Sequence, residues 1–354
     1  MLEEANNDIH TPALLVEIWR GSLIESRHRG HVVAVDRAGR IAASLGDPET
    51  FTYVRSSAKP FQCIPLLSSG AADRYGFNDQ EIALACASHN GEPVHTETAA
   101  GMLRKIGLDQ SALKCGVHEP FSSEVIRDLH ERGEQPNVLQ NNCSGKHAGM
   151  LALALHLGAP IQSYDAPDHP VQQMILRTIA QFTDVPEQDI VIGIDGCGAP
   201  VFGVTVFAMA LMYGRLVHPS ETFDEETREA CRRIVLAMNT YPEMIGGGLT
   251  ERLDTEVMRA ANGRIVSKVG AEGVYTAGIL PCREWPDGLG LAIKIEDGED
   301  RRARPTVVIE SLRQLGVLIG DAYTSVSQFA SFPIRNHRGD VVGEVRPSFE
   351  LKLT

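Results

Sequence analysis

Short runs of β-branched and aliphatic residues occur near both ends of the chain, and this feature limits the possible folds most strongly. Near the N-terminus the runs lie between residues 14 and 43, with glycines between them. Near the C-terminus they lie at 274–279, 291–295 and 341–345. Short runs of this kind separated by turn residues are typical of antiparallel strands. The pattern predicts one antiparallel sheet built from both chain termini.

Helical periodicity dominates the middle of the chain, from about residue 57 to residue 262. One helix is expected after Asp168-His169-Pro170, because proline is favoured in the first helical turn. Another follows the acidic residues 224–226, which suit the positive end of a helix dipole. A strand is expected at 190–194, and a later helix at Pro305, with its apolar face continuing to Ile319 and Ala322.

These regions predict an α/β (α+β) fold in which the terminal sheet is packed with helices and a helical lobe forms the centre. We expect a sheet-containing lobe from residues 1–54 and 265–354, and a mainly helical central lobe from residues 55–264. A chain of 354 residues is long enough for two such lobes. We expect the active site in the cleft between them.

Composition argues against several classes of protein. Lys+Arg 33 against Asp+Glu 46 gives a formal charge of −13, so a nucleic-acid-binding surface is not expected. The longest apolar stretch, 201–214, is shorter than the ~18 residues that span a bilayer, and we expect it to be buried. The seven cysteines form no C-x-x-C pair, and the polar residues 1–8 do not resemble an export signal. These features predict a cytoplasmic protein.

The first candidate catalytic motif is the Ser-x-x-Lys formed by Ser56 and Lys59, directly before Pro60. At this spacing on a helix the two side chains share a face, so a neutral amine could take the serine proton. The helix N-terminus would favour a developing oxyanion. A purely structural role is the alternative, because such a short motif often occurs by chance.

Two later motifs strengthen the catalytic interpretation. Ser88-His89-Asn90 forms a Ser-x-Asn step, and Lys268 begins a Lys-x-Gly step. Serine β-lactamases and penicillin-binding proteins use motifs in this order around their nucleophile. The spacing differs from theirs, and His89 could instead be a satisfied histidine at a helix terminus.

A third constellation surrounds Cys143 and Cys197. Ser144-Gly145-Lys146 precedes a helical run but lacks the first glycine of a phosphate loop, so nucleotide binding is rejected. Lys146, His147 and Asp195 add nitrogen and oxygen donors to the two thiols, although no short spacing indicates a metal. Buried free thiols are the favoured interpretation, and a cysteine nucleophile paired with His147 stays open.

Five segments together resemble the rhizobial-type L-asparaginase II family. They are RSSAKPFQ at 55–62, ACASHNGEP at 85–93, NNCSGKHAGML at 141–151, GIDGCGAP at 193–200 and SKVGAEGVY at 267–275. The likeness runs from about Leu15 to Val342. It implies a fold similar to that of serine β-lactamases, hydrolysis of L-asparagine and a homodimer.

The resemblance also implies roles for particular residues. The catalytic groups would be two Ser-Lys pairs, Ser56 with Lys59 and Ser88 with Lys268. Cys143, Lys146 and Cys197 would hold a Zn2+ ion that tunes substrate binding and does not activate water, and no organic cofactor is expected. We expect substrate contacts from five further residues, with Arg55 on the α-carboxylate and Asp195 on the α-ammonium. The other three are His89, Asn90 and Glu272.

These roles predict an L-asparagine amidohydrolase that works through an acyl-enzyme, with the roles of the two serines open to exchange. Two alternatives are weighed against it. One is a β-lactamase-like or DD-peptidase-like serine hydrolase, which the missing export signal disfavours. The other is a non-catalytic sensor of amino acids, which the retained Ser-Lys pairs disfavour.

Overall fold

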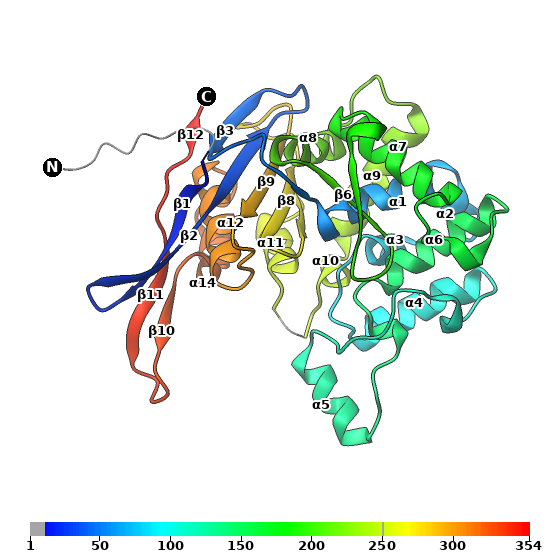
Figure 1. Cartoon of the computed structure of the whole chain (residues 1–354), viewed down its shortest axis with the longest axis horizontal. Helices are drawn as coiled ribbons and strands as arrows, with labels where there is room; N and C mark the ends of the chain where they lie inside the picture. Colours follow the sequence, from blue (N-terminus) through cyan, green and yellow to red (C-terminus); the bar gives the residue numbers. More distant parts are fainter. Residues whose placement is uncertain (1–10, 250) are drawn as a thin grey trace. The chain divides into compact units, whose positions relative to one another are not determined.

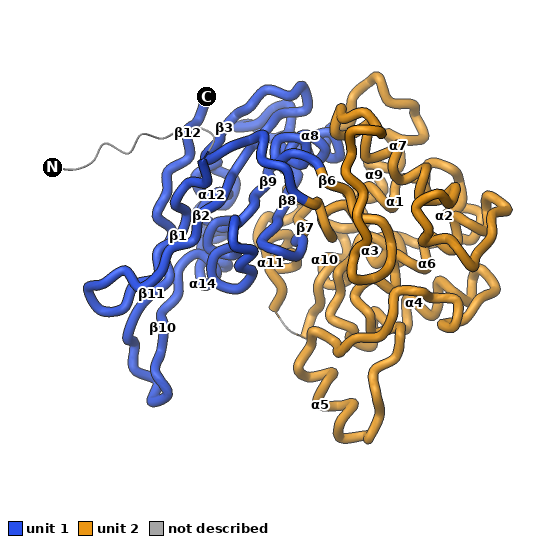
Figure 2. The backbone as a smooth tube through the Cα atoms, in the orientation of Figure 1, with its two compact units in different colours: residues 1–52, 204–218, 269–354 blue, residues 53–203, 219–268 orange. Residues whose placement is uncertain are grey.

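The computed structural model describes residues 11–249 and 251–354. Its contacts divide the chain into two units (Figure 2). Unit 1 comprises residues 1–52, 204–218 and 269–354, and unit 2 comprises residues 53–203 and 219–268. The polar segment 1–8, on which the absence of an export signal was argued, lies outside the described residues.

Unit 1 is built on an antiparallel sheet that joins the two ends of the chain (Figure 1). The N-terminal strand β1 (Ala13–Arg20) lies between β2 and the C-terminal strand β11, with Ile18 opposite Val345. The strand order is β10-β11-β1-β2-β9-β8, and β3 pairs with both β2 and β12. The remaining bounds are β2 (Leu23–Val35), β3 (Ile41–Leu45), β8 (Val274–Ile279), β9 (Leu289–Ile295), β10 (Phe332–Arg335), β11 (Val341–Pro347) and β12 (Lys352–Leu353). This arrangement confirms the predicted terminal sheet.

Helices α8 (Val206–Val217) and α12 (Ala303–Gln314) contact this sheet. Residues 30–35 of β2 are all buried, so both faces of the strand are covered, since successive side chains point to opposite faces. Gly290 allows α8 to approach closely, because a Cβ there would lie 1.8 Å from the carbonyl oxygen of Ala210. Short helices α13 (Asp321–Thr324) and α14 (Ser327–Ala330) complete the unit.

Unit 2 is mainly helical, as predicted for the middle of the chain. Helix α6 forms its centre, with residues 144–154 buried and contacts to α1, α3 and α4. The helices are α1 (Lys59–Ser68), α2 (Ala71–Arg74), α3 (Asp79–Ala85), α4 (Pro93–Lys105), α5 (Ser123–Arg132), α6 (Ser144–His156), α7 (Pro170–Thr183), α9 (Glu225–Thr240), α10 (Pro242–Ile245) and α11 (Leu253–Ala261). Short 3-10 turns lie at Arg55–Ala58, Gln110–Ala112, Val138–Gln140, Ile161–Ser163 and Glu187–Asp189.

A second sheet is small. β4 (Phe51–Tyr53), β6 (Pro200–Thr205) and β5 (Val191–Ile194) form a three-stranded sheet in the order β4-β6-β5. Strand β7 (Ile265–Val269) leads to the end of unit 2.

Local capping explains where several helices begin. His169, the residue before Pro170, caps α7 by accepting the backbone N–H of Val171. Asp224 caps α9 in the same way, through the N–H of Thr227. These starts agree with the sequence prediction.

Two sequence predictions differ from the structure. The apolar stretch 201–214 forms two elements, because Thr205 ends β6 and caps α8, and α8 belongs with the sheet of unit 1. Helix α12 ends at Gln314, before the predicted face reaches Ile319, because Gly316 takes a left-handed conformation (φ 72°) that stops the helix. None of the described helices is long and apolar enough to cross a membrane.

Candidate active site

A buried lysine at the start of α1 lies at the centre of the candidate site. Lys59 Nζ donates to Ser88 Oγ at 2.9 Å and to the carbonyl oxygens of Ala87 at 2.5 Å and Asn142 at 3.2 Å. Lys59 is only 1% exposed. These three contacts fix the position of the buried amine.

The serine of the Ser-x-x-Lys motif is the more accessible one. Ser56 is partly exposed, and its side chain has no hydrogen-bond partner among residues 11–249 and 251–354. Ser57 is buried and donates to the carbonyl oxygen of Lys268 at 3.1 Å. The structure therefore joins Lys59 to Ser88 by a hydrogen bond, whereas the predicted pairing joined it to Ser56.

A second buried lysine lies on β7. Lys268 Nζ is 3.4 Å from Asp254 Oδ2, and both side chains are fully buried. Burial lowers the pKa of Lys268, the charge of Asp254 opposes this, and Lys59 and Arg252 lower it again, to about 8. This amine is therefore far closer to losing its proton at neutral pH than an exposed lysine is.

The turn that carries Ser88 is held by residues distant in sequence. Its backbone N–H groups at Ser88 and Asn90 donate to the carbonyl oxygens of Ile245 and Gly246. Arg252 donates to Asn90 Oδ1 at 2.6 Å and to the carbonyl oxygen of Ser88 at 3.2 Å. The buried carboxylate of Glu92 accepts the N–H groups of residues 248 and 249.

His89 and Asn90, which we expected to contact substrate, have other partners. Both are fully buried. His89 Nδ1 accepts the N–H of Gly91, and Nε2 donates to Ser144 Oγ, whose own proton goes to a carbonyl oxygen. Burial and nearby cationic groups hold the pKa of His89 well below its ordinary value, so the ring is neutral. In this structure the two side chains hold the Ser88 turn in place, and their contact with substrate stays a prediction.

Arg55 and Asp195 form an ion pair, with Arg55 Nη2 3.1 Å from Asp195 Oδ1. Both are partly exposed, so either could exchange its partner for a charged ligand. Arg55 also has φ 54°, a left-handed conformation that costs a non-glycine residue about 1–3 kcal/mol and that clusters at functional sites. Glu272, the remaining predicted substrate residue, lies in unit 1 with φ 63°, and its role stays a prediction.

The two cysteines singled out in the sequence lie together. Lys146 Nζ is 3.0 Å from Cys197 Sγ, and Cys143 neighbours Cys197. The neighbouring thiol of Cys143, against the effect of burial and with the help of Lys146 and His147, holds the pKa of Cys197 far below its ordinary value. Burial lowers the pKa of Lys146, but the two cysteines raise it above its ordinary value. The two shifts together favour a thiolate on Cys197 facing an ammonium on Lys146.

Most of this sequence matches one known protein family. The family model described as L-asparaginase II matches residues 16–347. The chain belongs to the L-asparaginase II family. A search of curated proteins finds no match.

The similar solved structures of this asparaginase II chain are glutaminases or related proteins of low identity. A probable glutaminase from Bacillus subtilis, complexed with 6-diazo-5-oxo-L-norleucine, has 13% identity and a TM-score of 0.41, over 82% of this chain and 85% of that one. Mglu in its native form has 15% identity and a TM-score of 0.41, over 80% and 64%. A Bacillus glutaminase has 13% identity and a TM-score of 0.36, over 82% and 92%. No site residue is assigned from these similarities.

The cysteine cluster of this asparaginase II chain has donor atoms that suit zinc. Two sulfurs and an amine nitrogen are available, while Asp195 is engaged by Arg55. No group of three or more His, Cys, Asp or Glu side chains in the described parts of the chain could hold a metal ion. Lys146 would therefore have to be the third ligand, and it must lose its proton to bind.

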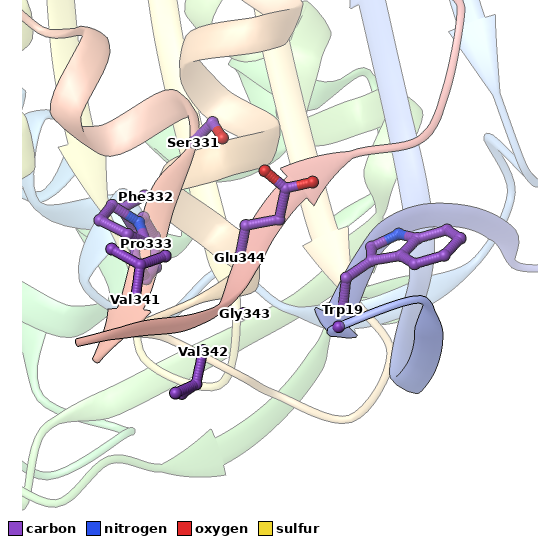
Figure 3. Close-up of a pocket in the computed structure, with 9 residues that line it drawn as sticks. Trp19, Ser331, Phe332, Pro333, Val341, Val342, Gly343 and Glu344 are labelled. Atoms are coloured by element: carbon purple, nitrogen blue, oxygen red, sulfur yellow. The ribbon is translucent and has the colours of Figure 1, made fainter. Parts of the chain in front are cut away.

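A hollow in unit 1 lacks the chemistry of this site. It has a volume of about 410 Å³ and lies beside Trp19, Phe332 and Glu344 (Figure 3). No lysine, histidine or cysteine lines it, and Ser331 donates to a carbonyl oxygen. Unit 2 therefore holds the candidate active site.

Sequence reasoning missed three residues of this site in the asparaginase II chain. Arg252 and Glu92 brace the Ser88 turn, and Asp254 pairs with Lys268. Asp254 lies in the first turn of α11, where an acidic residue is expected for the helix dipole alone. The sequence contained no signal that its carboxylate is fully buried.

Proposed function

We propose that this protein hydrolyses the side-chain amide of L-asparagine to L-aspartate and ammonia through a serine acyl-enzyme. The observation that carries the proposal is the buried hydrogen bond of 2.9 Å between Lys59 and Ser88, together with a second buried lysine whose pKa is about 8. A lysine hydrogen-bonded to one serine and three positions from another, beside a second lysine of lowered pKa, can relay protons for a serine nucleophile. Membership of the L-asparaginase II family supports amide hydrolysis.

Ser56 is the proposed nucleophile, because it is the more exposed serine and lies at the N-terminal end of α1. Its oxygen bonds to the amide carbon, and its proton passes to Lys59. The positive end of the helix dipole favours the tetrahedral oxyanion. The C–N bond then breaks, ammonia leaves with a proton from Lys59, and water hydrolyses the ester.

Lys59 must be neutral before it can accept that proton. Its hydrogen bond to Ser88 offers a route by which its own proton can leave, and Lys268 is the proposed acceptor. Once Lys268 is neutral, it can take the proton of Lys59. Lys59 is then neutral and can accept the proton of Ser56.

The Arg55–Asp195 ion pair is the proposed binding site for the two charged groups of the substrate backbone. In the free protein each side chain neutralises the other. A zwitterionic amino acid offers a carboxylate to Arg55 and an ammonium to Asp195, so it can replace one ion pair by two.

The test is ammonia release by purified Ser56→Ala and Ser88→Ala variants, with trapping by a diazoketone analogue of asparagine. We expect Ser56→Ala to lose activity by orders of magnitude and to lose the covalent adduct, whereas Ser88→Ala still forms an adduct slowly. Ser123→Ala, at an exposed serine on α5, is the control. An adduct on Ser88 in the wild-type protein would exchange the roles of the two serines, and near-normal activity of both variants would contradict the proposal.

The same assay separates the alternatives. Ammonia release from asparagine and glutamine, side by side, determines the preference, because one methylene is worth only ~1–3 kcal/mol in a pocket. Hydrolysis of a chromogenic β-lactam would instead indicate a β-lactamase. Thermal stabilisation by asparagine without ammonia release would indicate a sensor.

A Zn2+ ion on Cys143, Lys146 and Cys197 is also part of the proposal. When bound, zinc would hold the start of α6 and the turn after β5 together and so tune the position of Asp195. Elemental analysis of the native protein against Cys143→Ala tests this, and equal zinc in both would contradict it. The cytoplasmic location and the homodimer stay predictions.

A further inference from the structure

Asp254 is fully buried, and both of its carboxylate oxygens have partners near the proposed site. Oδ2 lies 3.4 Å from Lys268 Nζ, and Oδ1 accepts a hydrogen bond of 3.2 Å from Ser267. A carboxylate held at both oxygens cannot rotate away from the amine without losing a hydrogen bond in a place that water does not reach. The pair therefore has one defined geometry.

The charges around Lys268 show what this carboxylate opposes. Lys59 on α1 and Arg252 just before α11 are cationic, and the neutral thiol of Cys86 lies at the end of α3. The carboxylate of Asp254 opposes these two cations and raises the pKa of Lys268. Without it, a buried amine beside two cations would lose its proton far more easily.

The residues just before Asp254 contact the other half of the site. Arg252 donates to the backbone of Ser88 and to Asn90, while Glu92 holds residues 248 and 249. The same stretch of chain therefore fixes the Ser88 turn through Arg252 and the Lys268 amine through Asp254.

We infer that Asp254 is a positioning residue for the proposed hydrolysis: its carboxylate fixes the Lys268 amine and sets the pH above which that amine can accept a proton. The kinetic consequence of this inference rests on the proposed function. It concerns a residue that touches neither the substrate nor the bond that breaks.

Asp254→Asn is the decisive variant, because it removes the charge and keeps the size. We expect the acid limb of the pH profile of kcat/KM for L-asparagine to move to lower pH by about one unit or more. We also expect the plateau value of kcat to fall about 100-fold, because the amine is no longer held in place. KM should change little. A fall in kcat with the acid limb unmoved would overturn the inference.

A second readout does not depend on activity. The 13Cε signal of Lys268, assigned by its absence in Lys268→Met, should titrate at lower pH in Asp254→Asn than in the wild-type protein. An unchanged midpoint overturns the inference even if the enzyme is active. If wild-type protein released no ammonia, the proposed function would fail, and this titration would still decide the role of Asp254.

Two further variants complete the test. Glu256→Gln removes a charge from the same helix, where Glu256 pairs with Arg259 near the surface, and it should leave both readouts unchanged. Should Asp254→Asn fail to fold, the double variant Asp254→Asn/Lys268→Met should fold, because both buried charges are then gone. Failure of the double variant as well would mean that the carboxylate serves packing alone and would overturn the inference.

Discussion

Two lysines in unit 2 are equally buried and have opposite chemistry. Lys268 has its pKa lowered to about 8, whereas the pKa of Lys146 is raised above its ordinary value. Burial lowers the pKa in both places, so burial does not explain the difference. The neighbouring charges explain it. Lys268 has one carboxylate, Asp254, and two cations, Lys59 and Arg252, around it. Lys146 faces Cys197, beside Cys143.

The comparison shows how one residue type serves two purposes. A lysine with a surplus of positive charge around it can exchange a proton near neutral pH, which suits catalysis. A lysine paired with a thiolate keeps its proton, which suits a fixed structural contact. The following experiments would break or sharpen this distinction.

The largest expected effect is on catalysis. Lys268→Met should lower kcat for L-asparagine by about 10²–10⁴-fold, the usual contribution of a positioned acid or base. The free energy of unfolding at pH 7 should also fall, because the variant leaves Asp254 as a buried carboxylate without its counter-charge. Steady-state ammonia release and urea denaturation measure the two quantities. A stable variant with full activity would remove Lys268 from the mechanism.

The next effect is on stability and concerns the other lysine. Lys146→Met should lower the free energy of unfolding by about 3–5 kcal/mol, because it leaves a buried thiolate without its counter-charge. Denaturation of the metal-free protein at pH 7 measures this, with Cys197→Ala/Lys146→Met as the variant that removes both charges. A loss of less than about 1 kcal/mol would mean that Cys197 is a neutral thiol.

A third prediction is that pH acts on the two lysines in opposite directions. Lys268 has a folded-state pKa below its unfolded value of 10.5, so the unfolded chain binds more protons between pH 8 and 10.5. Wild-type stability should therefore rise across this window relative to Lys268→Met, by up to about 3 kcal/mol. Lys146 has a raised pKa, and its contribution should be lost as the pH rises above 10.5. Denaturation curves across pH 7–11 would reveal either slope.

The smallest expected effect tests the hydrogen bond behind Asp254. Ser267→Ala removes the donor to Asp254 Oδ1 and should lower the free energy of unfolding by about 1 kcal/mol. The acid limb of kcat/KM should move much less than in Asp254→Asn, since the charge remains. A shift as large as that of Asp254→Asn would mean that orientation of the carboxylate, more than its charge, controls Lys268.

Much of the fold could be predicted from local patterns. The β-branched runs with intervening glycines identified the terminal strands, and capping residues such as Asp224 identified helix starts. The end of α12 and the split of residues 201–214 into β6 and α8 were not predicted, because apolar periodicity continues through Gly316 and Thr205. One turn residue or cap outweighed the hydrophobic pattern in each place.

The candidate site was predictable by residue type but not by pairing. The motifs selected Ser56, Lys59, Ser88 and Lys268, yet the structure bonds Lys59 to Ser88 and places Lys268 against Asp254. His89 and Asn90 were expected to contact substrate, and the sequence did not predict that both are fully buried. Motif reading cannot detect the burial or the partners of these residues, because both are set by other segments of the folded chain. Lys59 and Ser88 are 29 positions apart, and Arg252 lies 164 positions from Ser88.

The sequence determined the terminal sheet, the helical middle, the order of the chemical motifs and the likeness to the L-asparaginase II family. These follow from local periodicity, capping and spacing, which are properties of neighbouring residues. Only the tertiary structure decided which lysine exchanges its proton and which keeps it. The charge state of a buried amine depends on the groups that face it, and Asp254 and Cys197 reach Lys268 and Lys146 only when the chain has folded.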